Sequence, residues 1–117
     1  MKITRNQSGN VTVLALSGRL DLASGATLKE QVQQEFQGNN VHIHLNLTKV
    51  DFINSSGLGA LVSLMKETRL KHGRLTMSNL AAYVTEIFEI TQLSHIFEIY
   101  QTEEEAIASY GAATSVQ

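Results

Sequence analysis

A strict alternation of apolar and polar residues near the middle of the chain constrains the fold more than any other feature. Residues 41–48 read VHIHLNLT, so every second side chain is apolar. A period of two indicates a β-strand with one buried face. A loop is expected over residues 50–57, and from Leu58 to about Lys71 apolar residues recur at the helical spacing. A strand that leads into an amphipathic helix is typical of α/β folds, in which crossover helices join parallel strands.

The N-terminal segments predict a β-hairpin. Residues 3–7 and 11–16 are β-prone runs on either side of Ser8-Gly9-Asn10, which is a turn sequence. Residues 18–21, with the sequence GRLD, are then expected to form a tight exit from the second strand.

The later segments alternate between helical and strand patterns. Leu28, Val32 and Phe36 recur at a spacing of four and predict a helix over residues 23–36. Thr102 and Glu105 match a capping box at the start of a last helix. The remaining predicted elements are a helix over residues 82–91 and strands over residues 75–78 and 96–100.

This order of elements predicts a single α/β domain over residues 1–117. Its sheet is expected to be mixed, with about five strands, an antiparallel N-terminal hairpin at one edge and about four helices. Residues 111–117 are small and polar, and we expect them to form a flexible tail.

The composition argues against several classes of function. The chain has no cysteine, which excludes disulfides, thiolate catalysis and cysteine-based zinc sites. Its 9 basic and 11 acidic residues include no dense basic run, so we expect no nucleic-acid partner. No apolar run is long enough to span a bilayer, and the N-terminus lacks the apolar core of a signal peptide. We therefore expect a cytoplasmic protein with no membrane insertion.

The most informative segment is residues 51–61, with the sequence DFINSSGLGAL. Ser55 and Ser56 stand just before a predicted helix, where a serine hydroxyl can cap a free amide of the first turn. The same position suits a phosphate, because the amides and the dipole at a helix N-terminus favour an anion. Spacing alone leaves the cap and the phosphorylation site equally open.

Other polar residues have structural interpretations as well. Asp21 follows a predicted strand, where a carboxylate caps the next helix or contacts a partner. His42 and His44 share one face of a strand and could hold a metal, but no third ligand is evident, so a structural or solvent-facing role is favoured and no metal site is predicted.

Catalysis and cofactor binding have little support in the sequence. Ser56 lacks the flanking glycines of a nucleophile elbow. The Gly57-Leu58-Gly59 segment lacks the lysine of a P-loop and the third glycine of a dinucleotide-binding fingerprint. Phe52, Phe88 and Phe97 lie in apolar runs and are expected in the core rather than around a ligand. We therefore expect a binding protein without a cofactor, not an enzyme.

Three of these segments together resemble the STAS domains of bacterial anti-sigma-factor antagonists. Residues 18–21 (GRLD) resemble the family's Gly-Glu-Leu-Asp motif, and residues 44–47 (HLNL) its central strand. Residues 52–59 (FINSSGLG) resemble the switch loop, which normally reads Asp-Ser-Ser-Gly or Asp-Ser-Thr-Gly. The resemblance extends from about Val11 to Tyr110 and implies a STAS-like fold.

The resemblance also implies a function and a site. Ser56 would be the phosphorylated serine, and the partner an anti-sigma factor that is also a serine kinase. Phosphorylation would end binding to that partner, and a metal-dependent serine phosphatase would restore it. The partner-binding residues implied are Asp21, Asn54, Ser55, Ser56, Gly57 and Leu58.

The sequence departs from the family pattern at two positions. Asn54 stands where the family usually has Asp, and Arg19 replaces the usual Glu. These changes are compatible with a different partner, or with a domain that is recognised by its partner without phosphorylation. The alternatives are therefore a STAS subunit that docks constitutively in a transport or signalling assembly, and a small-ligand or nucleotide-binding module.

Overall fold

The protein folds around one five-stranded mixed sheet, as a computed structural model of residues 1–115 shows, with side chains described as far as Gly111. The strands are β1 (Lys2–Ser8), β2 (Val11–Leu20), β3 (His42–Ile53), β4 (Arg74–Ser78) and β5 (Glu98–Tyr100). They lie side by side in chain order, with β1 antiparallel to β2 and all later neighbours parallel. The predicted mixed sheet with a hairpin at its edge is confirmed.

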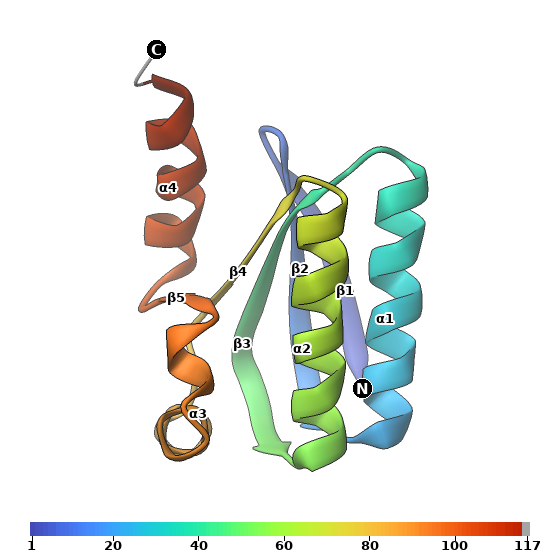
Figure 1. Ribbon diagram of the computed structural model, residues 1–117, viewed down its shortest axis with the longest axis vertical. Helices are drawn as coiled ribbons and strands as arrows, with labels where there is room; N and C mark the ends of the chain where they lie inside the picture. Colours follow the sequence, from blue (N-terminus) through green and yellow to red (C-terminus); the bar gives the residue numbers. More distant parts are fainter. Residues whose placement is uncertain (116–117) are drawn as a thin grey trace.

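Four α-helices and one short 3₁₀ helix complete the described part of the chain. They are α1 (Leu22–Gln37), α2 (Ser55–Leu70), α3 (Ala82–Ile90), η1 (Leu93–His95) and α4 (Glu103–Ser115). Helices α1 and α2 stand side by side over one face of the sheet (Figure 1). The expected tail begins within α4, and its last two residues, 116 and 117, lie outside the described residues.

The two faces of β2 are covered by different helices. Leu14 and Leu16 belong to the main core with α1 and α2, whereas Val11 and Val13 pack with Tyr110 of α4. Because successive side chains of a strand point to opposite faces, α4 must cover the face opposite to α1 and α2.

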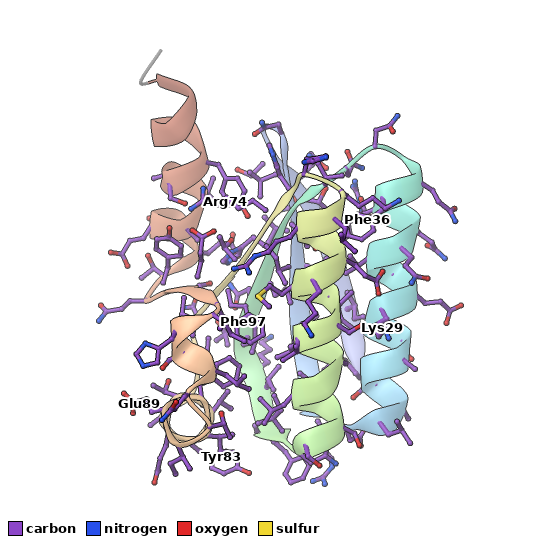
Figure 2. The ribbon with its side chains drawn as sticks, viewed as in Figure 1. Lys29, Phe36, Arg74, Tyr83, Glu89 and Phe97 are labelled. Carbon is purple, nitrogen blue, oxygen red and sulfur yellow. The ribbon has the colours of Figure 1, made fainter. Side chains whose placement is uncertain are left out.

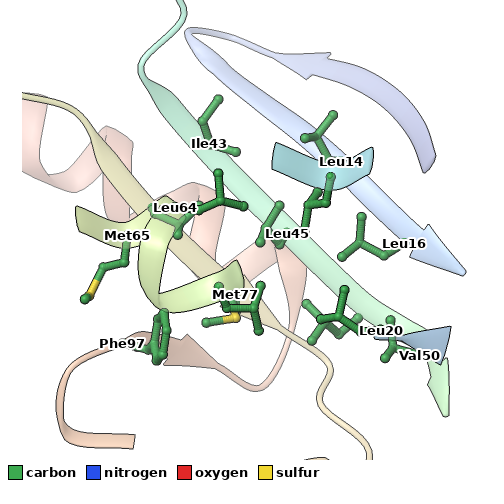
Figure 3. Packing of buried hydrophobic residues seen from close by; sticks show 14 of the residues in the cluster. Leu14, Leu16, Leu20, Ile43, Leu45, Val50, Leu64, Met65, Met77 and Phe97 are labelled. Carbon is green, nitrogen blue, oxygen red and sulfur yellow. The ribbon is translucent and has the colours of Figure 1, made fainter. Parts of the chain in front are cut away.

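The main core lies between the sheet and the α1–α2 pair (Figure 3). Ile43, Leu45 and Leu47 of β3 are fully buried, as their alternation predicted. Leu61 and Met65 of α2 are buried against the sheet, and Val41 and Leu58 are half-buried but also pack against this core. Complete burial of one such aliphatic side chain stabilises the fold by about 1.5–3 kcal/mol.

Several predicted element boundaries were wrong. Strand β2 continues to Leu20 instead of leaving the sheet at residues 18–21, and β3 continues to Ile53 through the first half of the expected loop. The pairing of these strands shifts register between Ala15 and Ser17 and again between Gly18 and Arg19. Such bulges interrupt the period of two, so the sequence pattern ended before the strands did.

Smaller differences affect the C-terminal elements. The last strand is only Glu98–Tyr100 and begins two residues later than predicted, because residues 96 and 97 form a turn after η1. The capping interaction of α4 is present in part: the Glu105 amide donates to Thr102 Oγ1 at 3.1 Å. Among the described residues, no helix is long and apolar enough to span a membrane.

Candidate functional site

Asn54 connects β3 to α2 and caps the helix. Its Oδ1 accepts a hydrogen bond from the Gly57 amide at 2.9 Å, and its backbone is extended. The backbone amide of Asn54 donates to the Leu20 carbonyl of β2 at 3.2 Å. Asn54 thus keeps a local hydrogen bond at the turn although it lacks the charge of the family's usual Asp. The interpretation of a serine as the cap is wrong, because the longer β3 moves the cap to Asn54.

Ser55 and Ser56 are therefore the first two residues of α2, and both side chains are exposed. Neither hydroxyl has a hydrogen-bond partner among the described residues. The first-turn amides of a helix have no acceptor within the helix, and Asn54 satisfies only that of Gly57. An anionic group on Ser56 would thus meet free amides and the positive end of the helix dipole.

Gly57 allows the start of α2 to approach β2 closely. A Cβ at this position would lie 2.7 Å from the Leu20 carbonyl carbon and would overlap its oxygen. Real Cβ atoms do not come so near to backbone, so any other residue here would push α2 away from the sheet. Gly57 is buried, in contrast to the exposed serines before it.

Asp21 has the same place after β2 that Asn54 has after β3. Leu20 and Ile53 are paired at the carboxyl ends of these parallel strands, so both helices begin at the same end of the sheet. The Asp21 carboxylate accepts from the Ser24 amide at 3.1 Å, and the Asp21 amide donates to Ser24 Oγ at 2.8 Å. The bond from the Ser24 amide, together with one from the Ser24 hydroxyl to the same carboxylate, lowers the pKa of Asp21. The predicted capping role is confirmed.

A shallow hollow, here called the α1–α2 hollow, lies beside Ser56. Its volume is about 190 Å³, and it is lined by Leu22, Ala26, Lys29, Ser56, Gly59 and Ala60. Leu22 at its rim is 74% exposed. The three residues from α1 could not be recognised from the sequence, because nothing local indicates which face of α1 meets the start of α2.

Arg19 and Phe52 lie next to each other on neighbouring strands. The Arg19 guanidinium is 3.7 Å from the centre of the Phe52 ring, a cation–π contact. Phe52 is half-buried beneath this contact and is not part of the core, so its predicted core position was wrong. Phe88 and Phe97 are buried as predicted, with ring centroids 5.5 Å apart.

His42 and His44 both face α4, and their roles are structural. Fully buried His44 contacts Thr76 Oγ1 through Nδ1 at 2.7 Å and Ser78 Oγ through Nε2 at 2.8 Å. Burial lowers the pKa of His44 to about 4. The His42 ring lies 5.6 Å from the Tyr110 ring. Within the described part of the chain, no three potential ligands gather to hold a metal.

Comparisons with known proteins agree on one family. The family model described as the STAS domain matches residues 2–106. The anti-sigma-B factor antagonist of Bacillus subtilis is 31% identical over 94 residues, which are 80% of this chain and 84% of that protein.

Solved structures show the same fold. TM1081 of Thermotoga maritima superposes with a TM-score of 0.86 at 24% identity and covers 92% of both chains. The anti-sigma factor antagonist SpoIIAA of Bacillus, in its phosphorylated form, superposes with a TM-score of 0.72 at 25% identity, over 93% of this chain and 99% of that one.

Proposed function

Because the chain belongs to the STAS domain family, we propose that it is an anti-sigma-factor antagonist switched off by phosphorylation of Ser56. In this proposal the unphosphorylated protein binds a cytoplasmic anti-sigma factor that is also a serine kinase. The kinase transfers the γ-phosphoryl group of ATP to Ser56 Oγ, which releases ADP and the hydroxyl proton. A metal-dependent serine phosphatase hydrolyses the ester and restores binding.

The observation that carries this proposal is the position of Ser56. Its hydroxyl is exposed on the first turn of α2, next to the α1–α2 hollow and beside first-turn amides that can receive a phosphate. A kinase can therefore reach the hydroxyl without unfolding the chain. A relative with 25% identity, SpoIIAA, has been solved in unphosphorylated and phosphorylated forms, which supports a phosphorylated state here as well.

The switch works through charge and not through refolding. A phosphate adds about −1.5 to −2 charges at pH 7. The helix terminus accommodates them, but a partner surface fitted to a neutral hydroxyl does not, unless basic groups answer the charge. A loss of about 3 kcal/mol in binding free energy would weaken the complex by roughly a hundredfold.

The partner surface is built from both helix starts. Asn54, Ser55 and Ser56 are exposed on it, Asp21 and Leu58 contribute partly exposed side chains, and Gly57 supports it from below. The side-chain amide oxygen of Asn54 suffices for the cap, so the family's usual carboxylate is not needed for folding at this position. We propose that Asn54 adjusts which partner is recognised.

The test is incubation with ATP and an anti-sigma kinase encoded beside this chain. Mass spectrometry then maps the phosphorylated residue, and a titration measures binding to the same kinase. Ser56 is expected to carry the phosphate, and the phosphorylated protein to bind roughly a hundredfold more weakly. Ser56→Ala should bind constitutively, Ser56→Asp should bind weakly while folded, and the matched control Ser55→Ala should still be modified.

Four outcomes contradict the proposal. Phosphate on Ser55 alone would show that Ser56 is not the phosphorylated residue. Undiminished binding after modification of Ser56 would show that phosphorylation does not control binding. Absence of modification by any co-encoded kinase would favour constitutive docking in a larger assembly. Nucleotide binding in calorimetry would favour the ligand-binding alternative.

A further inference from the structure

The α1–α2 hollow brings a lysine close to the proposed phosphorylation site. Gly25 of α1 and Ala60 of α2 are in tight contact, since a Cβ on Gly25 would lie only 2.9 Å from the Ala60 Cβ. The two helices therefore pack together at the level of Ser56, because the same Cβ on Gly25 would lie 3.9 Å from the Ser56 carbonyl oxygen. Ala26 and Lys29 of α1 and Ser56 and Gly59 of α2 line the hollow beside this contact.

Lys29 is the only charged residue that lines the α1–α2 hollow. It is half-buried and lies on the side of α1 that faces α2 (Figure 2). Within the described part of the chain, its ammonium group has no hydrogen-bond or ion-pair partner. Because side chains on a helix lean toward its N-terminus, Lys29 extends toward the end of α1 that lies beside Ser56.

The space between the two residues is open. Gly59 lines the hollow, and a Cβ built on it would meet no other atom within 4 Å. No side chain at this position therefore separates the ammonium group from a group attached to Ser56. Ser55 is equally exposed but does not line the hollow, so it lacks this access to Lys29.

We propose that Lys29 binds the phosphate of phosphorylated Ser56, so that the modified chain fills its own α1–α2 hollow. This rests on the proposed phosphorylation of Ser56. Lys29 is a positioning residue: it holds the phosphate over Gly59 and Ala60, beside the first turn of α2. Phosphorylation then both adds charge to the partner surface and occupies the recess that a partner side chain would otherwise enter.

The test measures the second pKa of a phosphoserine installed at position 56 during translation, by ³¹P NMR titration. No kinase is needed, so the result does not depend on whether the chain is a kinase substrate. The phosphate pKa is ordinarily about 6, and a neighbouring ammonium lowers it. Lys29→Met should raise it by about 0.2–0.7 unit, whereas Lys29→Arg should keep it low.

Two matched controls isolate the pair. Lys66→Met removes an exposed lysine from α2 outside the hollow and should leave the pKa unchanged. Lys29→Met should not affect a phosphoserine installed at position 55. The effect of Lys29 should also shrink at 1 M salt, where the screening length falls to about 3 Å.

The proposal is overturned if Lys29→Met shifts the pKa no more than Lys66→Met, or shifts phosphoserine 55 equally. Thermal unfolding of each variant verifies that the helices remain in place. A chain that shows the Lys29 effect but is not modified by its kinase would refute the proposed function alone. A chain that is modified and released normally without the Lys29 effect would refute only this inference.

Discussion

Mild acid should destabilise this protein through His44. The ring is fully buried between β3, β4 and α4, and both of its nitrogens contact hydroxyl groups, of Thr76 and Ser78. A hydroxyl can donate to one ring nitrogen and accept from the other, so the neutral ring is satisfied. Protonation would place a charge in the interior, which is why burial lowers the pKa of His44 to about 4.

The direction of the effect follows from the two pKa values. In the unfolded chain His44 binds a proton near its ordinary pKa of 6.5, whereas in the folded chain it does so only near 4. Between these values the unfolded state holds more protons, so the free energy of unfolding falls as the pH falls. The full loss is about 3 kcal/mol, since each pKa unit corresponds to about 1.4 kcal/mol, and about 2 kcal/mol of it is reached by pH 5.

The carboxylates of the Arg5–Glu35 and Arg74–Glu98 ion pairs do not interfere in this range. Glu35 and Glu98 have pKa values below the usual range, because Arg5 and Arg74 donate hydrogen bonds to them. Their contribution to stability is present above the unfolded pKa and is lost only as the pH falls further, toward their folded values. Glu103 acts in the opposite direction to burial, because its charge raises the pKa of His44.

Urea unfolding at pH 7, 6 and 5 measures the effect. The variant His44→Gln will have a lower stability at pH 7, but its slope between pH 7 and 5 should be nearly flat. His42→Gln is the matched control on the same strand face and should keep the slope of the native chain. A native chain that loses less than half of the expected 2 kcal/mol, or a His44→Gln chain with an unchanged slope, would refute the reasoning.

Three further predictions concern the core and the start of α2. Leu61→Ala should lower the free energy of unfolding by about 2–5 kcal/mol, because Leu61 is fully buried; unchanged thermal unfolding would contradict the packing described. Gly57→Ala should cost about 1–3 kcal/mol in denaturant unfolding, because its Cβ would overlap the Leu20 carbonyl, whereas Gly59→Ala should stabilise α2 by up to about 1 kcal/mol. Asn54→Asp should keep the cap and either speed phosphorylation or strengthen partner binding, and no change in either rate or affinity would make Asn54 a plain turn residue.

The sequence alone was sufficient for the fold class and for the order of elements. The alternation over residues 41–48 and the helical spacing after Leu58 are local patterns, and each is set by one side of an element facing apolar neighbours. Helix starts could also be recognised locally, as at Asp21, because a cap needs only the residues of one turn. The candidate switch segment was found from its two serines before a predicted helix and from its resemblance to the STAS switch loop.

Tertiary structure decided the features that join distant segments. The bulges between β2 and β3 lengthened both strands and moved the cap of α2 to Asn54, because strand ends depend on the pairing of two separate segments. His44 of β3 contacts Thr76 and Ser78 of the neighbouring strand β4. Lys29 of α1 and Ser56 of α2 line the same hollow. Periodicity shows which face of a segment is buried, but which residues meet there is fixed only when the helices pack on the sheet.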